Sequence, residues 1–329
     1  MLRSPHDNAP ALATTRPTRA KCQKKEGWGL GKGVHLPSPV LPFARRALLA
    51  GFGAAALVRP ALAWSWTGLA ERFRRIEAEA GGRLGVAVLD TQTGAIAGHR
   101  ADERFPICST FKAPLAAAVL ARVDAGRDRL DRRVSYTAAD LVAYSPVTER
   151  HAGAGMTLAE LCDAVVTLSD NGAANLLLRL LGGPPALTAW LRSIGDTVTR
   201  LDRDEPALNE ALPGDERDTS TPAAMLGSLR AVTLGEALSP ASRALFTGWL
   251  VDCRTGGQRL RAGLPAAWRV GDKTGTGERG TYNDIGLAWP PGRAPLFIAA
   301  YLTGNPGPAE RANGALAAVA RAVAEAVAG

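Results

Sequence analysis

The pentapeptide CSTFK at residues 108–112 marks the point where the chain changes from strand-like to helical patterning, because the apolar run Ala113–Leu120 follows directly. Residues three positions apart lie on one face of a helix, so the amine of Lys112 is expected near the hydroxyl group of Ser109. The first turn of a helix also offers unpaired backbone N–H groups and positive potential, which suit an oxyanion. The same spacing is common by chance, and an N-cap serine followed by a surface lysine is the plain alternative.

The patterns on both sides of this pentapeptide predict a fold of mixed class. Before it, a helix is expected over 71–80 and a β-hairpin over 83–100, where residues alternate around a Thr-Gly turn. After it, helical spacing recurs at 113–125, 157–169, 173–181, 185–194, 221–234 and 240–251. Strand patterns return at 268–277, 284–290 and 296–304, and an alanine-rich helix over 309–328 follows them.

Strands near both ends of this region are expected to join one sheet around the helical block. We therefore predict an α+β fold of two lobes, with an antiparallel five-stranded sheet flanked by the terminal helices and an inserted all-α lobe. The sheet lobe would be formed by residues 64–107 and 256–329, and the all-α lobe by residues 108–255. The cleft between two such lobes is a common place for a functional site.

The positive charge of the chain is concentrated in its first 63 residues. The formal net charge is +8, and residues 1–63 hold ten of the 39 basic but only two of the 31 acidic residues. The remainder is balanced, so composition gives no argument for a nucleic-acid partner.

Residues 1–63 are interpreted as a leader that is removed from the mature protein. Residues 1–40 are rich in proline and charge, which is typical of a disordered tail or of a start codon assigned too far upstream. Paired arginines, a short apolar stretch and a small-residue ending near Ala63 have the order of an export signal to the periplasm or the exterior. Arg45-Arg46 favours the twin-arginine route over the alternative Sec route, and the apolar stretch is too short for a stable membrane anchor.

The cysteines and histidines after the leader form no disulfide framework or metal-binding pattern. Cys108, Cys162 and Cys253 are odd in number, and no C-x-x-C pair occurs. Only His99 and His151 follow residue 63, so neither a metal nor another cofactor is predicted.

Two further short motifs carry candidate functional groups. The tripeptide SDN at 169–171 lies between two helical segments, where a capping turn is the plain interpretation. The tripeptide KTG at 273–275 lies on an expected strand, where its glycine would let a ligand or another backbone approach. Lys112 and Lys273 are the only lysines after residue 63. Because a lysine pKa is readily lowered and that of arginine is not, their positions favour a catalytic role.

The three motifs, in this order and spacing, resemble those of the class A serine β-lactamases. The polar segment RDEPALNEALPGDERD at 203–218 resembles the family's omega loop, since Glu205 and Asn209 match the pair that holds the hydrolytic water. Arg203 and Asp218 match the ion pair that closes this loop. The resemblance covers the chain from about residue 71 to its end.

The resemblance implies how an acyl-enzyme would form. Ser109 would attack the lactam carbonyl, and the backbone N–H groups of Ser109 and Thr276 would form the oxyanion hole. Either Lys112 or Glu205, acting through a water molecule, would accept the serine proton.

The later steps of the implied reaction use two more motif residues. Ser169 would relay a proton to the departing lactam nitrogen, with Lys273 favouring its ionised form. Glu205, held with Asn209, would then activate the water that hydrolyses the ester. The peptide bond before Pro206 matches one that is cis in the family.

A further set of residues is implied to bind the substrate. Many relatives have an arginine where Tyr282 stands, whereas Arg259 matches the alternative arginine of other members. Arg293 matches a position that is sometimes basic near the same pocket. The implied substrate-binding set is Tyr144, Asn171, Asn209, Arg259, Lys273, Thr274, Gly275 and Thr276.

Two cysteines match halves of family disulfides whose partners are missing. Cys108 pairs with a cysteine in a carbapenem-hydrolysing subset, but Gly277 occupies that place. Ala116 stands where the partner of Cys162 would be. Both thiols are expected to be free and buried, and carbapenem hydrolysis does not follow.

We therefore predict a monomeric β-lactamase whose partner is its small-molecule substrate and whose activity gives β-lactam resistance. The nearest alternative is a penicillin-binding D,D-peptidase, and another is a β-lactam sensor that is acylated but not turned over. The first would lack the loop with the Glu205 and Asn209 pair, and the second would have no working Glu205. A serine esterase would need a G-x-S-x-G motif, which Ser109 lacks.

Overall fold

The segments that build the central sheet come from both ends of the described chain. The computed structural model describes Trp66 and residues 68–328, so the leader predicted over 1–63 lies outside the described residues. Within them the largest sheet has the order β2–β1–β9–β8–β7, and every neighbouring pair is antiparallel. Its strands are β1 (Arg83–Asp90), β2 (Ile96–His99), β7 (Arg269–Gly277), β8 (Thr281–Trp289) and β9 (Leu296–Thr303).

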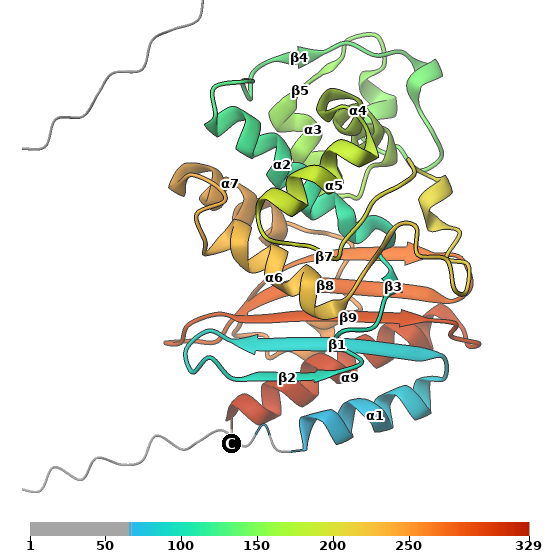
Figure 1. The fold of residues 1–329 in the computed structure, drawn as a ribbon, viewed down its shortest axis with the longest axis vertical. Coiled ribbons are helices and arrows are strands. Elements are labelled where there is room, and N and C mark those ends of the chain that lie inside the picture. Colours follow the sequence, from blue (N-terminus) through green and yellow to red (C-terminus); the bar gives the residue numbers. More distant parts are fainter. Residues whose placement is uncertain (1–65, 67, 329) are drawn as a thin grey trace, which may run out of the picture. The chain divides into compact units, whose positions relative to one another are not determined.

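Helices cover both faces of this sheet, because alternate residues of β1 enter two separate hydrophobic clusters. Val86 and Val88 pack in the cluster of α1 (Leu69–Ala80) and α9 (Ala309–Ala328), whereas Ala87 and Leu89 belong to the cluster of the helical lobe. Figure 1 shows α1 and α9 on one side of the sheet and α6 across the other. This two-sided burial explains why β1 is apolar along nearly its whole length.

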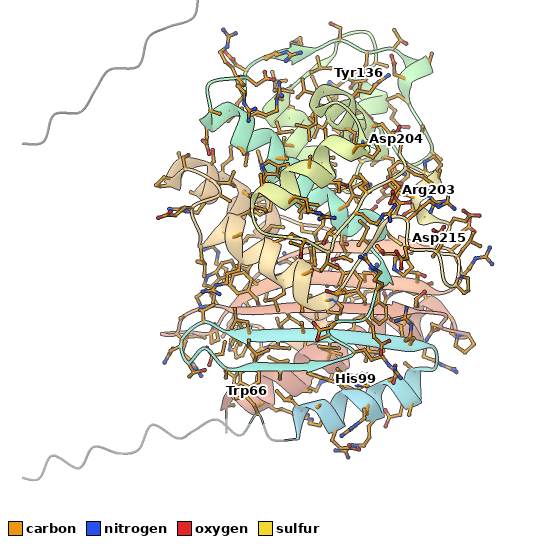
Figure 2. All side chains as sticks on the ribbon, in the orientation of Figure 1. Trp66, His99, Tyr136, Arg203, Asp204 and Asp215 are labelled. Atoms are coloured by element: carbon orange, nitrogen blue, oxygen red, sulfur yellow. The ribbon has the colours of Figure 1, made fainter. Side chains whose placement is uncertain are left out.

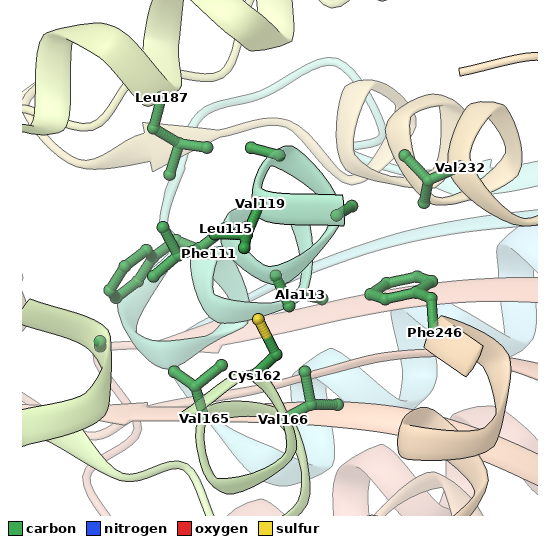
Figure 3. Close-up of a cluster of buried hydrophobic side chains, with 14 of the residues drawn as sticks. Phe111, Ala113, Leu115, Val119, Cys162, Val165, Val166, Leu187, Val232 and Phe246 are labelled. Carbon is green, nitrogen blue, oxygen red and sulfur yellow. The ribbon is translucent and has the colours of Figure 1, made fainter. Parts of the chain in front are cut away.

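The helical lobe surrounds one buried helix, α2, whose residues from Lys112 to Leu120 are all buried. Because a helix that is apolar on every side needs neighbours all around it, the other helices pack against α2. Figure 3 shows the side chains of Cys162 and Val165 facing those of α2. The helices of this lobe are α2 (Lys112–Asp124), α3 (Leu158–Thr167), α4 (Asn171–Leu181), α5 (Pro184–Ser193), α6 (Pro222–Thr233) and α7 (Pro240–Val251).

The short elements were not predicted from the sequence. Most are single turns or two-residue strands, whose formation depends on a distant partner. They are the 3₁₀ helices η1 (Cys108–Phe111), η2 (Ala138–Asp140), η3 (Thr148–His151) and η4 (Ala207–Asn209), the helix α8 (Leu260–Gly263), and the strand pairs β3 (Phe105–Pro106) with β6 (Thr219–Ser220) and β4 (Arg133–Val134) with β5 (Met156–Thr157).

The predicted α+β fold is confirmed, and one local expectation needs correction. Ser109 does not share an α-helix with Lys112, because Ser109 lies in η1 and α2 begins at Lys112. Residues three apart eclipse each other along a 3₁₀ turn, so the two side chains still meet. Among the residues described, no helix is long and apolar enough to cross a membrane.

Candidate active site

Ser109 is held where the 3₁₀ turn η1 touches the edge strand β7. A Cβ atom at Gly275 would lie 2.9 Å from the Ile107 carbonyl oxygen and 3.2 Å from the Ser109 nitrogen. Only glycine therefore allows this approach of strand and turn. Thr276, the next residue of β7, lines the same pocket as Ser109.

Two candidate proton acceptors surround the Ser109 hydroxyl group. The Nζ atom of Lys112 donates a hydrogen bond of 2.9 Å to Ser109 Oγ, and Ser109 Oγ lies 3.2 Å from Oε1 of Glu205. The same Oε1 atom lies 2.9 Å from Lys112 Nζ. Both charged side chains are completely buried. The hydroxyl group therefore contacts an amine and a carboxylate that pair with each other.

The buried amine of Lys112 is surrounded by oxygen atoms. It donates to Asn171 Oδ1 at 2.5 Å and to the Ser169 carbonyl oxygen at 2.8 Å, and it reaches Ser169 Oγ at 3.4 Å. Burial lowers the pKa of Lys112, although the charge of Glu205 opposes this effect. The amine of Lys112 is therefore held by several hydrogen bonds to protein oxygen atoms, and it loses its proton more easily than a lysine in water.

The SDN tripeptide is both a helix cap and part of the site. The Asp170 carboxylate accepts a 2.8 Å hydrogen bond from the Ala173 backbone N–H group and caps α4, which confirms the capping turn predicted at 169–171. Ser169, just before the cap, has a φ of 59° in the left-handed region. This turn directs the Ser169 hydroxyl group towards Lys273, whose Nζ atom donates to it at 3.0 Å.

Lys273 projects from β7 and is completely buried. Besides Ser169, its amine reaches the Thr274 carbonyl oxygen at 2.8 Å. Burial, helped by the nearby positive charge of Lys112, lowers the pKa of Lys273 to about 8. A lysine with this pKa changes charge close to neutral pH.

The loop over 203–218 is closed by the ion pair that the sequence predicts. The Nε atom of Arg203 lies 2.6 Å from Asp218 Oδ2, and the other Asp218 oxygen accepts backbone hydrogen bonds from Asp202 and Arg203 at 2.7 and 3.0 Å. Figure 2 shows Arg203 and Asp215 on this loop, where they lie 3.8 Å apart.

Within this loop Glu205 is fixed from several sides. The amide of Asn209 donates to Glu205 Oε2 at 2.5 Å, and the peptide bond from Glu205 to Pro206 is cis, as expected. The side chain of Asn175 on α4 bonds both to the Glu205 nitrogen, at 3.0 Å, and to its carbonyl oxygen, at 2.9 Å. The carboxylate therefore has little freedom to turn away from Ser109.

Arg259 is a buried cation without a carboxylate partner among the described residues. Its guanidinium group donates to the carbonyl oxygens of Gly275 and Asn283 at 2.8 and 2.7 Å and to Thr276 Oγ1 at 2.6 Å. The guanidinium carbon also lies 5.5 Å from the centre of the Tyr282 ring. Burial lowers the pKa of Arg259, and such a cation favours an anionic ligand nearby.

These side chains border a pocket of about 360 Å³ between the helical lobe and the sheet. Tyr144 stands at its rim with 59% of its surface exposed. Lys112, Glu205 and Lys273 lie beneath the surface residues and do not line the pocket itself. The lining residues are Ser109, Tyr144, Ser169, Asn171, Asn209, Thr255, Arg259, Thr274 and Thr276.

The sequence did not reveal three residues that hold the site together. Asn175 fixes Glu205, Thr255 shares a 2.6 Å hydrogen bond with Thr274, and Asn313 accepts a 3.0 Å bond from Arg259. Only Asn175 left a signal, because it lies one helical turn after Asn171 on α4. The expectation for Arg293 is wrong: it lies at the other end of the sheet, 3.2 Å from Asp90 Oδ2, and does not line the pocket.

The three cysteines of the described chain are free and buried, as predicted for Cys108 and Cys162. A Cβ atom on Gly277 would lie 2.6 Å from the Cys108 sulfur, so the thiol fills the space that a side chain at 277 would need. Burial raises the pKa of both Cys108 and Cys162, which keeps these thiols protonated and unreactive.

Comparison with known proteins places this arrangement in a family. A model of the β-lactamase enzyme family matches residues 68–327. β-Lactamase OXY-2 of Klebsiella oxytoca is 48% identical over 279 residues, which cover 85% of this chain and 96% of that protein. The carbapenem-hydrolysing β-lactamase KPC of Klebsiella oxytoca is 49% identical over 274 residues, or 83% and 91% of the two chains. The solved structure of an ancestral (GNCA) class A β-lactamase is 65% identical with a TM-score of 0.78, and the match covers 78% of this chain and 99% of that one. The chain therefore belongs to the class A serine β-lactamase family.

Proposed function

We propose that this protein hydrolyses the amide bond of penicillins and cephalosporins through a Ser109 acyl-enzyme, and so gives β-lactam resistance. The observation that carries the proposal is the position of Ser109 Oγ, which lies 2.9 Å from Lys112 Nζ and 3.2 Å from Glu205 Oε1. A hydroxyl group becomes a useful nucleophile when a base within hydrogen-bond reach accepts its proton.

Acylation begins with attack of Ser109 Oγ on the lactam carbonyl carbon. Either Lys112 directly or Glu205 through a water molecule takes the proton, since both groups lie within reach of it. The backbone N–H groups of Ser109 and Thr276 stabilise the oxyanion, which is supported by the close approach of β7 to η1 at Gly275. Ser169 then delivers a proton to the leaving nitrogen, beside Lys273.

Deacylation uses the carboxylate of Glu205 as general base towards a water molecule. The support for this step is the fixed position of the carboxylate, which Asn209 and Asn175 hold on the Ser109 side of the loop. Hydrolysis of the ester then frees Ser109 for another cycle. This step separates the proposed function from that of a D,D-peptidase or a β-lactam sensor.

The carboxylate that β-lactams share would bind at the sheet side of the pocket. Arg259 and the hydroxyl groups of Thr274 and Thr276 line that side, and the buried amine of Lys273 adds a second cation beneath it. Arg259 lacks a carboxylate partner in the described chain. Gly275 packs against the backbone of η1 and contributes by allowing β7 to approach Ser109. On the opposite rim, Tyr144, Asn171 and Asn209 contact the remaining substrate.

We further propose that the enzyme is an exported monomer that needs no cofactor. Support for export comes from the order of charged, apolar and small residues over 44–63. Carbapenems are left out of the proposal because Gly277 stands opposite Cys108, which is free.

Incubation of the purified protein with benzylpenicillin tests the proposal. We expect many turnovers per enzyme by loss of lactam absorbance, and a covalent adduct on Ser109 only transiently by intact mass. Ser109→Ala should show neither turnover nor adduct. Stoichiometric, lasting acylation without turnover would instead identify a sensor.

A further inference from the structure

The second half of the omega loop borders another pocket, which shares no lining residue with the catalytic one. Its volume is about 510 Å³, compared with about 360 Å³ for the catalytic pocket. Residues 211–216 of the loop form one wall, and the start of β1 with the end of β9 forms another. Asp215, labelled in Figure 2, marks the loop wall. A pocket of this size accommodates a small organic molecule.

Much of this lining is apolar and comes from separate segments. Pro106 belongs to β3, and Ala211, Leu212 and Pro213 belong to the loop. Ala211 is buried and has a φ of 51°, so the loop turns sharply at this wall. These side chains offer a surface for an aromatic or alicyclic body rather than for a strongly hydrated ion.

Two of the three arginines that line the pocket have no carboxylate within 4.0 Å among the residues described. Arg104 is anchored by one nitrogen, which donates to the Val198 carbonyl oxygen at 3.1 Å and to Thr219 Oγ1 at 3.0 Å. Arg279 is exposed and its side chain makes no hydrogen bond or ion pair with the described residues, while its carbonyl oxygen accepts a 2.9 Å bond from Gly304. Arg83, by contrast, is already paired with Glu103 at 3.0 Å.

The acidic residues of the lining do not cancel these charges. Asp215 lies 2.7 Å from Arg217 and 3.8 Å from Arg203, so its charge is already balanced. Glu216 is exposed and has no cation within 4.0 Å in the described chain. Two uncompensated arginines against one free carboxylate leave the pocket positive.

We propose that this pocket is a binding site for a small aromatic organic acid. The aromatic body lies against Pro106, Leu212 and Pro213, and the acid group pairs with Arg279 at the mouth and with the free guanidinium nitrogens of Arg104. Arginine suits this role because its planar, permanently charged group pairs with carboxylates and sulfonates and stacks on aromatic rings.

The experiment uses 8-anilinonaphthalene-1-sulfonate as the probe, titrated into the purified protein and followed by fluorescence. We expect saturable binding of one molecule, about fivefold weaker in Arg279→Ala and weaker still in Arg279→Glu. The control Arg127→Ala removes an exposed arginine that lies just beyond the end of α2 and has no side-chain partner among the described residues, and it should leave the dissociation constant unchanged. The uncharged analogue N-phenyl-1-naphthylamine should bind equally to all these proteins.

Two further results distinguish binding in this pocket from binding in the catalytic pocket or at nonspecific sites. Arg259→Ala removes the unpaired cation of the catalytic pocket and should not affect probe binding. Loss of binding in Arg259→Ala with retention in Arg279→Glu would place the probe in the catalytic pocket and overturn the proposal. Equal, non-saturating binding to every variant would overturn it as well. None of these readouts requires turnover, so they stand apart from the test of the proposed function.

Discussion

At the residue scale, the central feature is the contact of Ser109 with an amine and a carboxylate that are both buried. A buried ion pair costs more in lost hydration than an exposed one, unless further hydrogen bonds satisfy each partner. Here Lys112 gains Ser169 and Asn171, and Glu205 gains Asn209. The pair is therefore stable enough to persist and close enough to Ser109 to exchange protons with it.

Glu205→Gln should separate the two halves of the reaction. The amide keeps the shape of the carboxylate but cannot act as general base, so deacylation should slow by about 10²–10⁴-fold. Rapid-quench mass spectrometry with benzylpenicillin should then detect an accumulated Ser109 adduct. The control is Glu210→Gln in the same loop. Glu210 pairs with Arg203 but does not touch Ser109, so this variant should hydrolyse benzylpenicillin at the normal rate. An unchanged kcat in Glu205→Gln would remove Glu205 from the mechanism.

The lowered pKa of Lys273 predicts a pH dependence of substrate binding. With a pKa of about 8, the amine is mostly charged below pH 7 and mostly neutral above pH 9. KM for benzylpenicillin should therefore rise by up to about tenfold per pH unit above pH 8, while the substrate carboxylate stays ionised. Lys273→Arg, which keeps its charge, should shift that rise to higher pH. A KM of wild-type enzyme that is flat from pH 7 to 10 would contradict the assignment.

The sequence identifies the residues of the three motifs but not those that orient them. Ser109, Lys112 and Lys273 stand in recognisable spacing along the chain. Asn313 and Thr255 act only through contacts that the folded chain creates, across 54 residues to Arg259 and 19 residues to Thr274. No local pattern distinguishes such residues from any surface asparagine or threonine.

At the element scale, the omega loop is a segment of little regular structure that one buried carboxylate closes. Asp218, at one end of the neck, is 1% exposed and binds Asp202 and Arg203 at the other end. Since Glu205 and Asn209 lie on this loop, their positions depend on its closure.

Asp218→Ala should loosen this loop and affect both stability and turnover. Removing one partner of a buried ion pair costs roughly 3 kcal/mol of unfolding free energy. Deacylation should slow at the same time because Glu205 loses its fixed position. The matched control is Asp204→Ala, which removes an exposed side chain of the same loop that has no partner in the described part of the chain; Asp204 is labelled in Figure 2. It should change stability by less than about 0.5 kcal/mol. Equal effects of both substitutions would contradict this view of the neck.

The longer elements follow from sequence periodicity, while the shorter ones do not. The last helix has its predicted bounds, and α3 ends before the left-handed Ser169, two residues earlier than expected. Strand β8 begins at Thr281, three residues earlier than expected, because Tyr282 and Asn283 pair with Thr276 and Gly275. Such pairing is a property of the sheet and not of the segment itself.

At the scale of the whole molecule, the two hydrophobic clusters on opposite faces of the sheet have different relations to the site. The cluster that contains α2 also supports Ser109 and Lys112. The other cluster joins α1 and α9 to the far face of the sheet. Changes in it should therefore affect stability more than catalysis.

Two substitutions in α9 test this separation. Leu316 is completely buried in the far cluster, so Leu316→Ala should lower the unfolding free energy by about 2–5 kcal/mol. Gly314 in the same helix is exposed and has open space around it, so Gly314→Ala should raise stability by about 0.5–1 kcal/mol. Urea denaturation measures both. Either folded variant should keep kcat/KM within about twofold, and a large loss would show that the far face influences the site.

The pairing of β1 with β9 also affects the order of events during synthesis. Arg83 pairs with Thr303 along the middle of the sheet, so β1 leaves the ribosome more than two hundred residues before its partner exists. At about 5–20 residues per second, this wait lasts roughly 10–40 s. During that time the apolar β1 has only the short β2 beside it, and its other edge is open to other chains. The nascent protein is thus most prone to aggregation until β9, at residues 296–303, has been made.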